Sequence, residues 1–220
     1  PEHQEKERAV LSPEQVLRVL KFTCRPEYYD YYMMHCAILI AVGCTLRGGE
    51  IGGLQWNRVY YDQQAMNIDR VIDRVSKKNM EKLSKMEIMY TFPNLYPGTK
   101  TSIVLKQPKT DGSVRVVKSP NNVLEALSVL KELLVLKEMQ DKLKKELGAD
   151  GYMDYDLVIC QANGRPIMTE HLNKRFKDIL AEMNDPEIDP EEIVFHSLRH
   201  TSASAKLTLS NGDYNSVKQA

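Results

Sequence analysis

Two arginines and a histidine, drawn from opposite ends of the chain, have the chemistry to bind and transfer a phosphoryl group. Arg47 lies in the run Thr45-Leu46-Arg47-Gly48-Gly49-Glu50-Ile51, and His196 and Arg199 lie in Phe195-His196-Ser197-Leu198-Arg199-His200. Two planar, permanently charged guanidinium groups can bracket a phosphate and stabilise the extra charge of its transition state. An imidazole titrates near neutral pH and suits proton transfer beside them. The combination fits phosphoryl transfer without a metal ion.

Each of these residues is ordinary when it is taken alone. A surface arginine commonly forms an ion pair, and a lone buried histidine is commonly a hydrogen-bonded core residue. His196 and Arg199 are three residues apart, so they share one face of a helix. The order of the two runs, their separation and the turn Pro108-Lys109-Thr110-Asp111-Gly112-Ser113 between them argue against coincidence.

Together these runs resemble the split active site of the tyrosine recombinases, and in particular the catalytic domain of the phage and conjugative-transposon integrases. The resemblance extends from about Ser12 to Ala220. It implies a mainly α fold with a small antiparallel β-sheet, the fold of the DNA breaking-rejoining enzymes. It also identifies the four catalytic residues as Arg47, Lys109, His196 and Arg199.

The resemblance assigns a role to each residue. The two arginines bind the phosphate, and His196 accepts a proton from the attacking hydroxyl or hydrogen-bonds the phosphate. Lys109 protonates the departing 5′ oxygen from a flexible turn, and Glu50 supports the local structure around Arg47. Three other basic residues compete with Lys109 for its role: Lys100, Lys106 and Arg115.

The activity that the resemblance implies is site-specific recombination, the integration or excision of a mobile element. A tyrosine attacks duplex DNA to give a 3′-phosphotyrosine, and a 5′ hydroxyl of the partner DNA reverses the step. The covalent intermediate divides one difficult displacement into two easier ones. The expected partner is double-stranded DNA, on which the full-length protein acts as a homotetramer, and neither a cofactor nor a metal is expected.

The family's nucleophilic tyrosine follows the His-x-x-Arg helix after a further histidine or tryptophan. Tyr214 is the only tyrosine after Arg199. It lies in an Asn-Gly-Asp-Tyr turn, which we interpret as structural. We therefore expect residues 1–11 to be the linker remnant of a missing N-terminal DNA-binding domain. Residues 12–220 are then the catalytic domain, truncated before the nucleophile and inactive in cleavage.

Three other functions stay open at this point. A non-catalytic DNA-binding relative of the integrases lacks the tyrosine naturally. A type IB topoisomerase shares the site chemistry but relaxes supercoils instead of nicking one site. A helical protein-interaction domain with fortuitous motifs predicts no salt-dependent binding to DNA.

Charge is unevenly distributed in a chain whose formal net charge is zero. Residues 69–118 contain eleven Lys and Arg but five Asp and Glu, whereas residues 182–192 contain six acids and no base. This asymmetry predicts one face that attracts phosphate, with solvated surface as the plain alternative. The four cysteines form no Cys-x-x-Cys pair and have no histidine at ligand spacing. We interpret them as buried free thiols of a cytoplasmic protein without a signal peptide or membrane span.

Helical periodicity dominates the rest of the chain. Helices are expected from Ser12, from near Glu27 to Val42, and around Arg47 to Glu50. A long helix is expected from Pro120 until Gly148 stops it, followed by one that Thr169 caps.

Strands are expected at 59–61, 66–72, 102–106 and 113–117, with the last two forming a hairpin around Lys109. Residues 156–160 are expected to be a strand or an extended segment. The stretch from Ser76 to Lys100 is interpreted as an insertion, either a flap that contacts DNA or a partner, or a tolerated loop.

Overall fold

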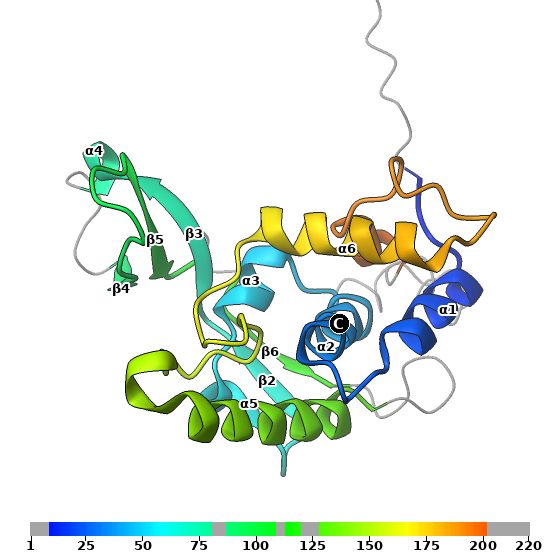
Figure 1. Cartoon of the computed structure of the whole chain (residues 1–220), viewed down its shortest axis with the longest axis horizontal. Helices are drawn as coiled ribbons and strands as arrows, with labels where there is room; N and C mark the ends of the chain where they lie inside the picture. The colour runs from blue at the N-terminus through cyan, green and yellow to red at the C-terminus, as the bar shows by residue number, and fades with distance from the viewer. Residues whose placement is uncertain (1–8, 81–86, 109–112, 120–127, 202–220) are drawn as a thin grey trace, which may run out of the picture.

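Four long helices form the body of the protein. The computed structural model describes residues 9–80, 87–108, 113–119 and 128–201. The helices are α1 (Pro13–Thr23), α2 (Tyr29–Cys44), α5 (Val129–Gly151) and α6 (Thr169–Met183). Helix α2 lies between α5 and α6 (Figure 1) and also packs against α1. It is apolar on every side, and it is buried because the other three helices surround it.

The first helix begins where the sequence predicts. The Ser12 hydroxyl accepts a hydrogen bond from the Gln15 backbone, and the Gln15 side chain accepts one from the Ser12 backbone. Pro13 occupies the first helical position, where no backbone donor is needed. The helix buries Val16, Val19 and Leu20 against the core.

Two small antiparallel sheets accompany the helices. One sheet has the order β1-β2-β6, formed by Val59–Tyr60, Ala65–Ile68 and Arg115–Lys118. The other has the order β3-β5-β4, formed by Val71–Ser76, Thr101–Lys106 and Ile88–Thr91. Three short helical pieces complete the described elements: α3 (Gly48–Gly53), η1 (Trp56–Arg58) and α4 (Lys77–Met80).

Two strand predictions are wrong, one in the extent of a strand and one in its pairing. The expected strand 66–72 is two strands, β2 and β3, which belong to different sheets. Asp69, at the junction, forms ion pairs with Arg58 and Arg70. The expected hairpin of 102–106 with 113–117 does not form, since β5 pairs with β3 and β4 whereas β6 pairs with β2. Local alternation of side chains predicts a strand but not its partner.

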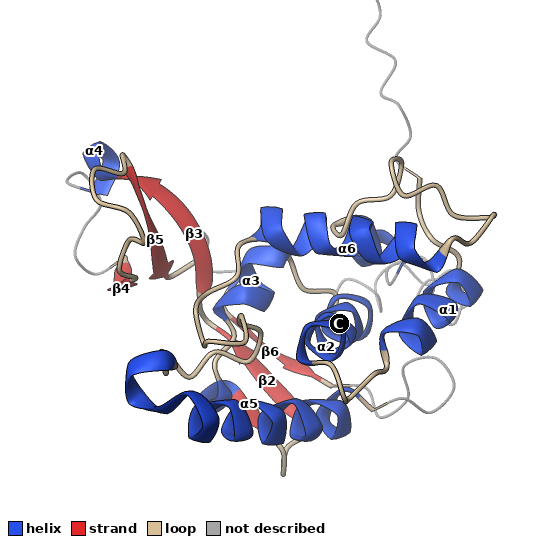
Figure 2. Ribbon diagram, viewed as in Figure 1, coloured by secondary structure: helices blue, strands red, loops and turns tan. Residues whose placement is uncertain are grey.

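The expected insertion builds the second sheet. Between Ser76 and Lys100 lie α4 and β4, and β4 adds to the edge of β5. Figure 2 shows this sheet projecting from the helical body. Its inner face packs Ile72, Phe92 and Leu105 with Met168 into a small second core.

The long helix breaks where the sequence predicts its end. It is described from Val129, and the expected start at Pro120 lies outside the described residues. Leu133 and Leu136 are buried in the core, but Leu134 is 46% exposed because it faces away from the core. Gly148 adopts a left-handed φ of 68° and breaks the helical backbone.

An irregular segment follows the long helix and leads into α6. Residues 156–160 form two isolated bridges, Gln55 with Leu157 and Cys160 with Pro166, and no regular strand. Asp156 has a left-handed φ of 59°, and Gly164 lies in a turn with a φ of 78°. Thr169 is the first residue of α6, and Met168 occupies the cap position without a side-chain hydrogen bond, so the expected Thr169 cap is wrong.

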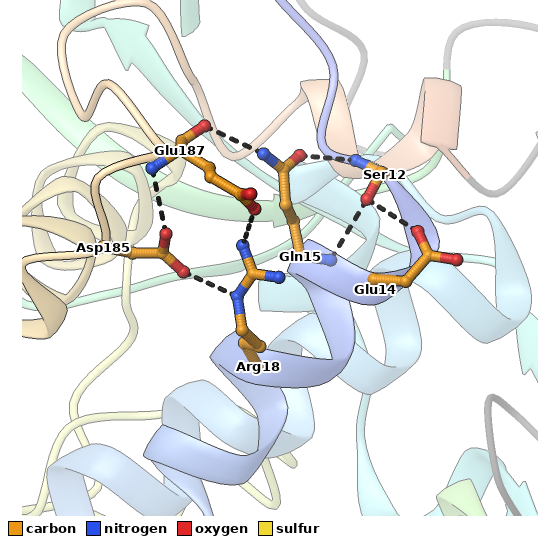
Figure 3. Close-up of polar contacts among 6 residues, drawn as sticks. All are labelled: Ser12, Glu14, Gln15, Arg18, Asp185 and Glu187. Carbon is orange, nitrogen blue, oxygen red and sulfur yellow. Dashed lines mark hydrogen bonds and ion pairs between the residues drawn. The ribbon is translucent and has the colours of Figure 1, made fainter.

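The acidic segment after α6 is tied to α1. Arg18 donates hydrogen bonds to Asp185 and Glu187, both at 2.6 Å, and Gln15 donates to the Glu187 carbonyl (Figure 3). These contacts direct the chain from the end of α6 towards His196.

One cysteine prediction is corrected. All four cysteines are free thiols, but Cys24 is exposed and only Cys36, Cys44 and Cys160 are buried. Cys24 follows the last turn of α1, where the chain leaves the helix. Among the described residues, none of the helices has the length and apolarity that a membrane span requires.

Candidate active site

Arg47 lies at the start of a very short helix. It is the N-cap of α3, as the sequence predicts, with an extended backbone (φ −80°, ψ 153°). Its backbone N–H donates to the Glu50 carboxylate at 2.8 Å, and its Nη1 lies 3.4 Å from the same carboxylate. The Arg47 side chain is 54% exposed. Glu50 therefore fixes the base of Arg47 while the guanidinium stays accessible to a ligand.

Glu50 is a buried carboxylate with an exposed fraction of 2%. Burial by itself would raise its pKa. Hydrogen bonds from Arg115 and from the Arg47 backbone outweigh burial and hold the pKa of Glu50 below its ordinary value. Glu50 is thus a charged group that positions its neighbours, which agrees with the supporting role expected of it.

Arg115 is the residue whose position the sequence does not reveal. It begins β6, and its Nη1 and Nη2 donate to the two oxygens of Glu50 at 2.9 and 3.2 Å. The sequence presents Arg115 only as a competitor of Lys109. No local signal identifies its partner, because Glu50 lies 65 residues away and the pairing depends on β6 joining β2.

Arg199 comes from the other end of the chain. Burial lowers the pKa of its guanidinium, and the positive charges of Arg47 and Arg115 lower it further, while Glu50 opposes them. The structure therefore brings Arg199 into the electrostatic range of the other two arginines. Its Nη1 is buried and makes no hydrogen bond within the described part of the chain. Such a donor is available to a phosphate oxygen.

Contacts on both sides of Arg199 fix its position. The Phe195 ring packs edge-on against Phe176 of α6, and the Phe195 N–H donates to Asn173 at 2.9 Å. Leu198 is buried, and the Thr201 hydroxyl donates to the Leu11 carbonyl at 3.0 Å. The described helical residues 197–201 are therefore held against α6 and the start of α1.

His196 and Lys109 are less closely defined. His196 is exposed and precedes the first helical residue, Ser197. Its ring lies edge-on to that of His200, with the two ring centroids 5.5 Å apart. Lys109 lies outside the described residues. The structure thus brings Arg47 and Arg199 together, places His196 one turn before Arg199, and leaves the position of Lys109 as a prediction.

Two competitors of Lys109 have partners of their own. Lys106 is buried in its sheet and forms an ion pair with Asp73 at 2.6 Å. Arg115 is bound to Glu50. Neither is therefore a mobile cation of the kind that protonation of a leaving oxygen needs.

The glycines of α3 allow the helix to pack closely. A Cβ on Gly53 would lie 2.9 Å from Cα of Val71 in β3, and a Cβ on Gly48 would lie 2.7 Å from the Thr169 side chain. Gly48 and Gly49 are consecutive glycines, and glycine has a low helix propensity. They permit α3 to approach β3 and α6, and this contact holds Arg47 in place.

The cluster therefore has two guanidinium groups, those of Arg47 and Arg115, in contact with the buried Glu50 carboxylate, and that of Arg199 within electrostatic range of all three. The carboxylate neutralises one positive charge, so the cluster retains an excess of two among these four residues. Such an arrangement can bind a dianionic or pentavalent phosphorus group through several charged donors.

Comparison with known proteins identifies the fold. No family model matches the chain. It is 24% identical over 173 residues to a tyrosine recombinase XerC-like protein of Caldanaerobacter subterraneus subsp. tengcongensis, across 79% of this chain and 38% of the relative. The integrase of transposon Tn1549, solved with transposon right end DNA, superposes with a TM-score of 0.69 at 16% identity, over 99% of this chain and 59% of that one.

A second solved structure agrees. The XerA recombinase superposes with a TM-score of 0.56 at 14% identity, over 100% of this chain and 56% of that one. These comparisons confirm the resemblance drawn from the sequence and the expected fold, mainly α with small antiparallel sheets. The chain spans 38% of the curated relative and less than two thirds of these two solved chains.

Proposed function

We propose that this chain, which has the fold of the tyrosine recombinase catalytic domain, binds duplex DNA and supplies the phosphate-binding residues for site-specific strand cleavage and rejoining. The observation that carries the proposal is that Arg47 and Arg115 contact buried Glu50, with Arg199 in electrostatic range of all three. Stabilising an oxyanion requires donors that are fixed before the reaction begins. Arg47 and Arg199 are supported in this way from two separate parts of the fold.

In this proposal each residue acts at a defined point of the reaction. Arg47 and Arg199 bind the non-bridging oxygens of the scissile phosphate. His196 accepts the proton of the attacking tyrosine or hydrogen-bonds the phosphate, and Lys109 protonates the departing 5′ oxygen. The phosphorus to 5′ oxygen bond breaks as the bond to the tyrosine oxygen forms, so the bond energy is conserved as a 3′-phosphotyrosine.

Arg115 has a positioning role in this scheme. Its two contacts with Glu50 hold the guanidinium against the carboxylate, and they keep the carboxylate charged and in place next to Arg47. The tyrosine would come from outside the helix of Arg199, and we do not assign it to Tyr214. We further propose that four copies of the full-length protein act together on two DNA segments.

Two measurements on the 220-residue chain test the proposal. The first is binding to a fluorescent duplex as a function of salt, with Arg47→Ala and Arg199→Ala compared with Arg25→Ala, which lies beside Phe22 and Tyr31 outside the cluster. We expect affinity to fall as salt rises. In a plot of the logarithm of the binding constant against the logarithm of the salt concentration, each cluster variant should reduce the magnitude of the slope by about one. Arg25→Ala should not change this slope. Binding without salt dependence would contradict the proposal.

The second measurement uses a suicide duplex that traps a covalent adduct on a denaturing gel. The 220-residue chain should give no adduct. A longer form that carries a tyrosine in the family position should give one that disappears in Arg47→Ala. An adduct formed by the 220-residue chain would show that Tyr214 or another residue is the nucleophile. DNA binding without an adduct in the longer form would favour a non-catalytic DNA-binding relative.

A further inference from the structure

A second cluster of chemically reactive side chains lies where α1, α2 and α5 meet. It consists of Cys24 just after α1, His35 within α2 and Glu132 in the first turn of α5. One ligand atom from each residue, a thiol sulfur, an imidazole nitrogen and a carboxylate oxygen, lies within 4.8 Å of the other two. None of the three belongs to the arginine cluster, and the proposed function does not use them.

The hydrogen bonds of His35 define its tautomer. Its exposed fraction is 1%, and its Nδ1 lies 3.1 Å from the Leu20 carbonyl oxygen. The Thr23 hydroxyl lies 3.3 Å from the same nitrogen but donates its proton to the Val19 carbonyl. A carbonyl only accepts hydrogen bonds, so Nδ1 carries the proton. In the neutral ring, Nε2 therefore presents a lone pair. This buried atom makes no hydrogen bond within the described residues.

A metal-binding histidine has the same arrangement. It usually donates its other N–H to a backbone carbonyl or a carboxylate, which fixes the ring and makes the free nitrogen more basic. A buried lone pair without a donor is costly in a protein that binds nothing there. His35 thus has the tautomer and the orientation of a ligand, and its Nε2 makes no hydrogen bond within the described residues.

The distance between His35 and Glu132 also fits a shared ion better than a direct bond. Nε2 lies 3.7 Å from Oε2 of Glu132. This is longer than an N–H···O hydrogen bond, which spans about 2.7–3.2 Å. Two ligands at about 2.0–2.1 Å on a tetrahedral zinc ion are separated by roughly 3.4 Å. The two atoms are therefore near the spacing at which one ion contacts both.

Glu132 is held in a state that can bind a cation. The Tyr32 hydroxyl donates to its Oε2 at 2.5 Å, and the Tyr32 ring stacks on the His35 ring. The hydrogen bond from the Tyr32 hydroxyl favours the charged form of the Glu132 carboxylate. The carboxylate is thus charged and oriented by an outer partner, as ligating carboxylates commonly are.

Cys24 provides both the third ligand and access from solvent. It is the only exposed cysteine, and rotation about its side-chain bond moves the sulfur relative to the other two atoms. Partial burial and the charges of Glu132 and Glu27 raise the pKa of its thiol. That shift disfavours the alternative in which Cys24 is a reactive thiolate, because nucleophilic cysteines have lowered pKa values.

We propose that Cys24, His35 and Glu132 bind one Zn²⁺ ion, with water as the fourth ligand. Sulfur, imidazole and carboxylate together are a ligand set of zinc, and a magnesium or calcium site would be built from oxygen alone. On binding, the thiol loses its proton to solvent and the sulfur bonds to the metal. The ion then links the end of α1 to α2 and to the first turn of α5.

The test uses the untagged 220-residue chain after treatment with a chelator and dialysis. We expect it to bind one equivalent of Zn²⁺ and to unfold at a higher temperature when the ion is present. With Co²⁺ as a spectroscopic substitute, a thiolate-to-metal charge-transfer band and the visible bands of tetrahedral cobalt should appear. Cys24→Ser should abolish the charge-transfer band and weaken zinc binding by more than about a hundredfold. Even a residue that only hydrogen-bonds a metal ligand typically contributes about 10–100-fold to metal affinity.

Matched controls separate ligands from bystanders. Glu132→Gln should weaken zinc binding as Cys24→Ser does, whereas Glu138→Gln, an exposed carboxylate on the same helix, should leave it unchanged. The zinc affinity of His35→Gln is compared with that of His171→Gln, which changes an exposed histidine on α6. Cys24 is exposed, so its serine variant keeps the fold, and its circular dichroism without metal should match that of the parent.

Two results would overturn the proposal. One is the absence of stoichiometric zinc binding in the parent chain, which would leave His35 and Glu132 as a pair that is charged only when the imidazole is protonated. The other is a Cys24→Ser variant that binds zinc as tightly as the parent and retains the charge-transfer band.

Discussion

Arg115 and Glu50, 65 residues apart in the chain, meet in a two-pronged ion pair at 2.9 and 3.2 Å. The pair connects β6 to α3, and through the Glu50 carboxylate it connects β6 to the backbone of Arg47. The side chain of Arg47, which is more than half exposed, is thus positioned by a carboxylate that is almost completely buried.

Replacing Glu50 with Gln should destabilise the protein and change its response to acid. The substitution preserves shape but removes the charge that two arginines face, at a cost of about 1.5–3 kcal/mol for charge-assisted hydrogen bonds. The folded pKa of Glu50 lies below its ordinary value of 4.5. Its stabilising contribution is therefore complete above that value and declines as the pH falls through the folded pKa.

Urea unfolding of the parent and Glu50→Gln at pH 7 and at pH 3 measures this effect. The difference in free energy of unfolding should be smaller at pH 3. Exposed Glu138→Gln should change stability by less than about 0.5 kcal/mol at either pH. An unchanged difference between the two pH values would show that the Glu50 charge does not support the fold.

Arg199 should be required for catalysis much more than for binding. In a form of the protein that carries the nucleophilic tyrosine, Arg199→Ala should slow cleavage about a thousandfold, the equivalent of about 4 kcal/mol, since one oxyanion donor is lost. Arg199→Lys should restore little, because an ammonium cannot reproduce the two-pronged contact of a guanidinium. The cleavage rate and the binding affinity of the parent and both variants are measured on the same DNA. Near-parental cleavage by Arg199→Ala would remove Arg199 from the active site.

Gly53→Ala should destabilise the protein although alanine is the better helix former. The added Cβ would lie 2.9 Å from Cα of Val71 and 3.0 Å from the Arg70 carbonyl oxygen, and neither backbone atom can rotate away. We expect a loss of about 1–3 kcal/mol, as in other overpacked sites. Gly151→Ala is the control, since its nearest neighbour is the partly exposed Leu147 side chain. Equal stability of the two variants in thermal unfolding would contradict the close packing of α3.

Gln140→Leu should break a buried polar connection between three elements. Gln140 accepts a hydrogen bond from the Trp56 indole at 2.8 Å and donates one to the Val158 carbonyl at 2.9 Å. Leucine would leave both groups unpaired, at about 1–3 kcal/mol each. Trp56 is the only tryptophan, so its fluorescence reports the unfolding directly. The exposed Gln63→Leu should unfold as the parent does.

The sequence predicts the local features of this fold well. Ser12, Pro13 and Gln15 predict the start of α1 because capping depends on neighbouring residues alone. The uniformly apolar stretch of α2 predicts a buried helix for a similar reason. The two arginine runs predict a shared site because each has a recognisable local motif; Arg199 lies within electrostatic range of Arg47, and the catalytic roles of both stay predictions.

Long-range relationships are what the sequence leaves out. The strand at 101–106 has the same alternation whichever partner it joins, so the expected hairpin was wrong. The Arg115 to Glu50 pair depends on that same choice of partner. Cys24, His35 and Glu132 have no motif spacing and meet only because three helices pack together.

The composition of α3 makes the site all-or-none in folding. Four of its six residues are glycine, and each costs about 1 kcal/mol relative to alanine in a helix. A helix this short does not persist in isolation. It exists because β3 and the start of α6 surround it. Arg47 therefore depends on the packing of α3 for its native position, and a protein molecule that loses this packing loses the contacts between Arg47 and Glu50 in the same cooperative step.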